Sequence, residues 1–126
     1  MALTMKLLNG KYGVCGLDES EEIPDWAYKG EFYSISKTSE ELSIVSSESN
    51  IPNNIQYEGD WRILKVQGPL DFSLVGILSS ISAVLAKQEI SLFVISTYDT
   101  DFILIKEKDL RKSIDSLHAE GYNIIK

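Results

Sequence analysis

The stretch from Ser96 to Asp101 gathers hydrogen-bonding side chains between two apolar runs. The sequence predicts strands over Ile90–Ser96 and Phe102–Lys106, because both runs are rich in β-branched and aromatic residues. A tight hairpin with a purely structural role is expected to carry Asn-Gly or Asp-Gly at its tip. The turn between these strands instead reads Thr-Tyr-Asp-Thr-Asp, which favours a site for a small polar ligand.

Asp101 is the first candidate for contact with such a ligand. It stands one residue before a strand expected to be buried, where a carboxylate is costly to desolvate unless a cation or hydrogen-bond donors meet it. The ordinary alternative is a solvated turn aspartate, and Asp99 is given that role. For Asp101, the neighbouring Thr97 and Tyr98, and Glu41 at the corresponding place in the first half, favour ligand binding.

The second half of the chain supplies the elements that hold this turn. The predicted elements are a strand over 61–67, a helix over 74–85, strands over 90–96 and 102–106, a helix from 109 to a glycine stop at 121, and a strand over 122–125. Asp71 or Ser73 is placed to cap the first helix. The resulting order, β-α-β-β-α-β, is the ferredoxin-like arrangement of an α+β protein.

The first half carries a fainter copy of this pattern. With an offset of 60 residues, Ile35-Ser36 falls on Ile95-Ser96, and Glu41 falls on Asp101. The segment that precedes Ile35 is shorter by about two helical turns, and Pro24 within it restricts a helix. We therefore predict two tandem ferredoxin-like modules, residues 1–60 and 61–126, of which the first has shortened helices.

Composition and charge exclude several classes of partner. The net charge is -7, since residues 1–60 hold 4 Lys+Arg against 11 Asp+Glu and residues 61–126 hold 8 of each. Nucleic acids and anionic membranes require clustered Lys and Arg, so neither is an expected partner. No apolar run reaches the ~18 to 20 residues of a membrane span. The single cysteine, Cys15, excludes an internal disulfide and favours a cytoplasmic setting.

The sequence shows no catalytic constellation. A nucleophile–base pair, a metal-ligand cluster and a nucleotide-binding loop are all missing from it. His118 follows the core-facing Leu117 on the second predicted helix, with no nucleophile beside it. We therefore predict a protein that is not an enzyme and that uses no cofactor or metal.

Two segments resemble the signature of the ACT domain family, acid-x-Pro-Gly-hydrophobic-Leu followed by Gly-Ile-Asn-Ile. They are Ser73–Leu78 and Glu89–Leu92. Ser73 replaces the acid, Val75 the proline, Glu89 the glycine and Ser91 the asparagine. Ile95–Ile105 and Glu41–Val45 further resemble the double-ACT, aspartate-kinase-like subfamily, which includes cytosolic arginine sensors of animals.

The resemblance implies a regulatory protein, forming a homodimer, that binds an amino acid or similar small zwitterion at an ACT–ACT interface. The residues predicted to contact the ligand are Ser43, Ile44, Asp71, Ser73, Leu74, Val75, Gly76, Thr97, Tyr98 and Asp101. Ser43 and Ile44 would offer backbone groups, and the loop that ends at Gly76 would bind the carboxylate at the start of a helix. The turn Thr97–Asp101 would surround the ligand with polar groups.

Two alternatives stay open. Gly76 could serve only to let the helix pack closely on the sheet. The protein could also be a ligand-free interaction module that dimerises through its ACT edges.

Overall fold

The computed structural model describes residues 3–67 and 76–126. Its elements, in chain order, are β1 (Thr4–Leu7), β2 (Tyr12–Leu17), the 3-10 helix η1 (Asp25–Tyr28), β3 (Ser34–Lys37), β4 (Leu42–Ser47), the 3-10 helix η2 (Glu48–Asn50), β5 (Tyr57–Val66), α1 (Ile77–Lys87), β6 (Leu92–Ser96), β7 (Asp101–Lys106), the 3-10 helix η3 (Glu107–Asp109), α2 (Leu110–Ala119) and β8 (Asn123–Ile125). The α+β class and the helices and strands predicted for the second half are confirmed. The cap predicted for the first helix at Asp71 or Ser73 is wrong, because α1 begins at Ile77 with Gly76 as its N-cap.

The chain divides into two compact units. The split unit comprises Met1–Asn9 and Arg62–Lys126, and the inserted unit comprises Gly10–Trp61. Strand β5 contributes its first five residues to the inserted unit and its last five to the split unit. The division differs from the predicted boundary after residue 60 mainly at the N-terminus, where β1 is grouped with the C-terminal part of the chain.

In the split unit, β1 lies inside the sheet. Met5 is in register with Val66 of the antiparallel strand β5 and with Ile124 of the parallel strand β8. On the other side, β5 pairs with β7, and β7 pairs antiparallel with β6. The strand order is therefore β8-β1-β5-β7-β6, and β1 separates the first strand of the β-α-β-β-α-β motif from its last.

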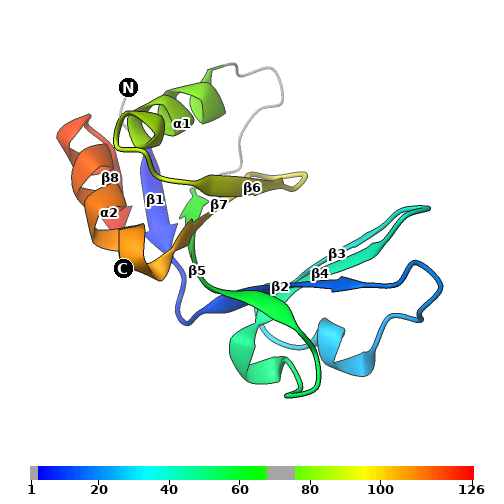
Figure 1. The fold of residues 1–126 in the computed structure, drawn as a ribbon. Helices are drawn as coiled ribbons and strands as arrows, with labels where there is room; N and C mark the ends of the chain where they lie inside the picture. The colour runs from blue at the N-terminus through cyan, green and yellow to red at the C-terminus, as the bar shows by residue number, and fades with distance from the viewer. Residues whose placement is uncertain (1–2, 68–75) are drawn as a thin grey trace. The chain divides into compact units, whose positions relative to one another are not determined.

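Helices α1 and α2 cover one face of this sheet (Figure 1). The buried core between them consists of Met5, Leu64, Val66, Ile81, Leu85, Ile90, Ile103, Ile105 and Leu117. Because successive side chains of a strand point to opposite faces, Ile103 and Ile105 of β7 face the helices and Leu104 faces away. No helix in the described part of the chain is long and apolar enough to cross a membrane.

The inserted unit repeats the element order with 3-10 helices in place of α-helices. Its strands run in the order β3-β4-β2-β5, and each neighbouring pair is antiparallel. Its buried core consists of Cys15, Ala27, Leu42, Ile44 and Ile51. The predicted shortening of the helices in this module is confirmed, since η1 has 4 residues and η2 has 3.

Both α-helices end in the same hydrogen-bonded turn. After α1, the N–H of Glu89 donates to the Ala86 carbonyl (2.9 Å) and that of Ile90 donates to the Leu85 carbonyl (3.1 Å). This pair of bonds is a Schellman motif, which needs a left-handed residue just after the helix. At the end of α2 that residue is Gly121, with φ +96°, whereas after α1 it is Glu89, with φ +57°. Glu89, which replaces the glycine of the family signature, therefore occupies a conformation that favours glycine.

Replacing Glu89 with glycine is expected to stabilise the protein by about 1 kcal/mol, because glycine adopts the left-handed conformation without a Cβ clash. Urea unfolding followed by circular dichroism would measure this change in the free energy of unfolding. The matched control is Glu120→Gly, at the C-cap of α2 with φ -92°, where glycine should only destabilise. Equal losses of stability in the two variants would contradict the prediction.

Candidate functional site

The polar turn predicted to bind a ligand joins β6 to β7. The two strands close on the pair Ser96 and Asp101, and residues 97–100 form the loop. Both the N–H and the hydroxyl of Thr97 donate to the Thr100 carbonyl, at 2.8 and 3.1 Å, and the N–H of Thr100 donates back to the Thr97 hydroxyl at 3.4 Å. The hydroxyl of Thr97 is therefore engaged in building the turn.

Thr100 connects this turn to the end of β5. Its side chain is buried, and its hydroxyl donates to the carbonyl of Val66 at 2.5 Å. Val66 is the last residue of β5, so this bond fixes the position at which the chain leaves the sheet on its way to α1. Sequence reasoning gave Thr100 no role of its own, because a threonine between two aspartates in a turn carries no sign of burial.

Asp101 is the first residue of β7 and is half-buried. The hydroxyl of Ser96 donates to its Oδ1 at 2.5 Å. Since side chains alternate along the strand, Asp101 lies on the same side of β7 as Ile103 and Ile105, which face the helices. No Lys or Arg within residues 3–67 and 76–126 forms an ion pair with Asp101. This carboxylate is therefore available to bind a cationic group that does not belong to the described residues.

Tyr98 and Asp99 form the exposed tip of the same hairpin. The Tyr98 side chain is 82% exposed, and Asp99 is exposed as predicted. A ring with so much exposed surface can cover the side chain of a ligand that reaches the tip.

Gly76 immediately precedes α1 and has φ +85°. Among the described residues, a Cβ added there would meet only the Ser79 hydroxyl oxygen, at 4.0 Å. The left-handed conformation is therefore a sufficient reason for a glycine here, and the described residues show no close packing that would require one. The first N–H groups of α1 have no acceptor within the helix, which leaves them able to bind an anion. The other residues predicted for this loop, Asp71, Ser73, Leu74 and Val75, lie outside the described residues.

Ser43 and Ile44 lie in β4, which is paired with β2 on one side and with β3 on the other. The backbone groups of such an interior strand bond to both neighbours, so those expected to reach a ligand are engaged in the sheet. Ile44 is fully buried in the core of the inserted unit. Ser43 is half-buried and faces the opposite side of β4, so its side chain is the group left for contact with a ligand.

The loop between β3 and β4 repeats the hydrogen bonds of the loop 97–100. The N–H of Thr38 donates to the Glu41 carbonyl (2.9 Å), and the Thr38 hydroxyl accepts the N–H of Glu41 (3.1 Å). Loop 38–41 therefore corresponds to loop 97–100, with an offset of 59 residues instead of the predicted 60. Glu41 is not the counterpart of Asp101; the first residue of β4, a buried leucine, takes that place.

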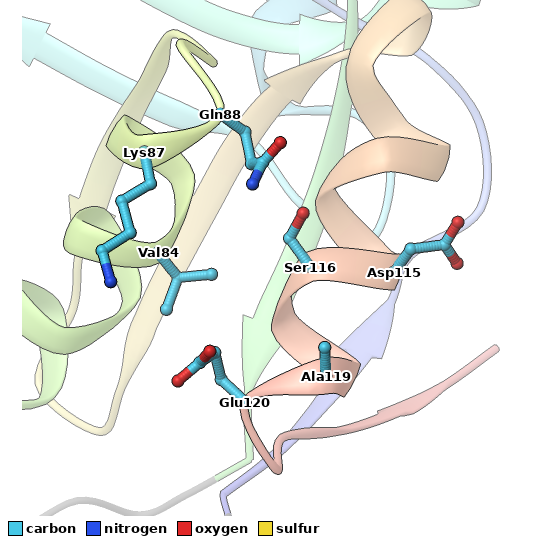
Figure 2. Close-up of a pocket in the computed structure, with 7 residues that line it drawn as sticks. All are labelled: Val84, Lys87, Gln88, Asp115, Ser116, Ala119 and Glu120. Carbon is cyan, nitrogen blue, oxygen red and sulfur yellow. The ribbon is translucent and has the colours of Figure 1, made fainter.

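A groove between α1 and α2 is a second candidate site (Figure 2). Its volume is about 280 Å³, and it is lined by Val84, Lys87, Gln88, Asp115, Ser116, Ala119 and Glu120. Lys87 and Glu120 bring opposite charges to it from the two helices, whereas Asp115 points away. None of the described residues that were predicted to bind a ligand lines the groove, and ligand pockets usually measure about 300–1,000 Å³. We therefore place the candidate site at the β6–β7 hairpin.

Two buried groups of the inserted unit, Cys15 and Tyr12, have shifted pKa values. Burial raises the pKa of the Cys15 thiol, which therefore stays protonated and unreactive at neutral pH. Burial, and to a lesser extent the Glu31 carboxylate, raise the pKa of Tyr12. The described residues contain no group of three or more His, Cys, Asp or Glu that could hold a metal ion.

Comparison with known families gives a match in each half of the chain. A model of the ACT domain matches residues 56–119, and a second model, described as an N-terminal domain, matches residues 10–54. The matched segments adjoin near the beginning of β5, which both units share.

Two curated relatives show similarity over most of the chain. The Bos taurus protein named cytosolic arginine sensor for mTORC1 subunit 1 is 31% identical over 100 residues, which are 71% of this chain and 30% of the sensor. The human protein CASTOR3P is 33% identical over 102 residues, which are 71% of this chain and 63% of that protein. The chain thus spans less than two thirds of either relative, and 30% of the sensor.

Solved structures show the same fold. A crystal structure of a protein from Agobacterium tumefaciens is 39% identical, with a TM-score of 0.93 that covers 99% of this chain and 93% of the other. The aspartate kinase of Clostridium acetobutylicum matches with a TM-score of 0.67 over 90% of this chain and 33% of the kinase. At 12% identity, the kinase supports the fold alone.

The bond between Thr100 and Val66 yields a stability prediction. Thr100→Val keeps the shape of the side chain but leaves the Val66 carbonyl without this donor, so it should lower the free energy of unfolding by about 1–3 kcal/mol. Thr97→Val, in the exposed part of the same turn, should cost less because water can replace its bonds. Chemical denaturation of both variants would measure the difference. A Thr100→Val protein as stable as the wild type would show that the bond contributes nothing.

Proposed function

Because the chain belongs to the ACT domain family, we propose that it is a non-enzymatic regulatory protein that binds a free amino acid. The observation that carries this proposal is the environment of Asp101. Its carboxylate is half-buried at the start of a buried strand, accepts a hydrogen bond from Ser96, and has no cationic partner among the described residues. Removing a carboxylate from water is costly unless a positive group meets it, and an amino acid carries such a group.

The two ends of an amino acid match two features of the split unit. The ligand's ammonium, or a cationic side chain, would bind Asp101, and Thr97 and Tyr98 would line the same side of the ligand. Its carboxylate would bind the N–H groups that follow Gly76 at the start of α1, which have no acceptor within the helix. The loop residues Asp71, Ser73, Leu74 and Val75 complete this carboxylate site in the proposal, on the strength of their place in the ACT signature.

We place the ligand at an interface between ACT modules, either within the chain or between two copies in a homodimer. In this arrangement Ser43 contributes its side chain, and Ile44 holds β4 in place from the core. A ligand that contacts two modules stabilises the arrangement in which both contacts are made, and a partner protein could recognise that change. The relatives named cytosolic arginine sensors support a cytosolic location and make arginine the first ligand to test.

Isothermal titration calorimetry of the whole chain against each of the twenty amino acids tests the proposal. At least one amino acid should bind, and Asp101→Asn should weaken that binding at least about tenfold, because the neutral amide keeps the shape of the side chain and removes its charge. The matched control is Asp99→Asn, on the exposed tip of the same turn, which should bind as the wild type does.

If none of the twenty amino acids bound, or if Asp101→Asn bound the ligand as tightly as the wild type does, the assignment of this site would be overturned. Thermal unfolding at increasing ligand concentration gives an independent check, since a ligand that binds only the folded state raises the melting temperature.

A ligand-free module that dimerises through its ACT edges is the second candidate. One observation favours it: the hydroxyls of Thr97 and Thr100 are both engaged inside the split unit, which leaves fewer groups for a ligand. This alternative requires a dimer whose stability is insensitive to every amino acid and to Asp101→Asn. Sedimentation velocity with and without amino acids would distinguish it from the sensor.

A further inference from the structure

The inserted unit carries the excess negative charge of the protein. Residues 10–61 contain 3 Lys+Arg and 11 Asp+Glu, a net charge of -8, whereas the whole chain has -7. Ten of these eleven acidic residues are exposed. Exposed charge by itself only solvates a surface, so it identifies a docking site only where another feature of the same surface requires a partner.

That feature is a pair of exposed tyrosines. The side chains of Tyr28 and Tyr33 are 54% and 40% exposed, and their rings meet edge to face with centroids 6.2 Å apart. The two rings therefore contact each other and still leave a large surface to solvent. Aromatic side chains placed in this way are characteristic of interaction surfaces.

The tyrosines adjoin a free strand edge. Tyr33 directly precedes β3, which pairs with β4 and ends the strand order β3-β4-β2-β5 (Figure 1). Within the described residues, the other edge of β3 has no strand beside it. The N–H and C=O groups of such an edge can pair with an added strand.

Acidic residues flank both ends of this edge. Asp25 lies in η1 with Tyr28, and Glu31 lies two residues before Tyr33. At the far end of β3, the Lys37 ammonium donates to the Glu19 carbonyl, so the acidic loop Asp18–Glu22 begins within reach of the last side chain of the strand. A segment that paired with β3 would therefore meet Glu31 near one end and come near this acidic loop at the other.

We propose that the free edge of β3, with Tyr28 and Tyr33, is a docking surface for an extended, arginine- or lysine-rich segment of a partner protein. Guanidinium and ammonium groups bind the faces of aromatic rings and are attracted by the surrounding carboxylates. A second copy of the chain is a poor occupant, because the same face would bring two units of charge -8 together. Unlike the amino-acid site, this surface lies wholly within the inserted unit and does not depend on the proposed function.

Fluorescence anisotropy with the full chain and a labelled octapeptide of alternating Arg and Val tests the docking surface. The peptide should bind at 50 mM NaCl and bind at least about tenfold more weakly at 300 mM, because salt screens exposed charges. Tyr28→Ala/Tyr33→Ala should weaken binding about five- to thirty-fold, whereas Tyr28→Phe/Tyr33→Phe, which keeps both rings, should retain it. Circular dichroism would establish that each variant is folded.

A matched pair of charge variants separates this surface from general acidity. Asp25→Asn/Glu31→Gln alters the proposed surface, and Asp115→Asn/Glu120→Gln removes the same charge from the split unit. Only the first pair should weaken peptide binding. Equal effects of the two pairs, full binding by the double alanine variant, or no binding of the peptide at 50 mM NaCl would each overturn the proposal. If the double alanine variant sedimented differently from the wild type but bound the peptide equally well, the surface would be a contact between copies of the chain. That result would also overturn the proposal.

Discussion

The split unit depends on the pairing of β1 with both β5 and β8. Met5 is fully buried in the core, and its partners in register, Val66 and Ile124, come from the middle and the end of the chain. Without β1, strands β5 and β8 would each lose a neighbour, and the core would lose the side chain of Met5. The inserted unit lies in the sequence between β1 and the part of β5 that pairs with it. Forming this pairing therefore closes a long loop of chain, and its entropic cost grows only slowly with loop length.

The same constraint determines where the candidate site can form. Pairing with β1 fixes β5 in the sheet, and the buried hydroxyl of Thr100 fixes the last residue of β5 to the beginning of β7. The pairing of β5 with β7 and this buried bond together hold the end of β5 beside the β6–β7 turn. The chain that leaves this end of β5 leads to Gly76 and the first turn of α1. In the proposed site, the β6–β7 turn is therefore ordered before the ligand binds, which reduces the ordering cost of binding.

Patterns among neighbouring residues predicted most elements of the split unit. They could not predict the pairing of strands that lie far apart in the sequence. Helical spacing, a glycine stop and alternating apolar residues identified both helices and β5 to β8, because each signal lies within a few neighbouring residues. The four residues of β1 carry no such pattern, since their place in the sheet depends on strands near the middle and end of the chain. The repeat was found but misaligned by one residue, because matching Ile35-Ser36 to Ile95-Ser96 by identity ignored which face each side chain takes.

The corrected repeat makes the inserted unit an internal reference for the candidate site. Both hairpins carry a threonine that builds the turn through the same bonds, so this threonine reflects folding and gives no evidence for a ligand. The hairpins differ at the first residue of the following strand, which is the fully buried Leu42 in one and the half-buried Asp101 in the other. A leucine at this position adds to the core, whereas an aspartate there adds no apolar contact and accepts one hydrogen bond, from the Ser96 hydroxyl. The fold therefore does not require a carboxylate here, and the proposed cationic ligand supplies a reason for its presence.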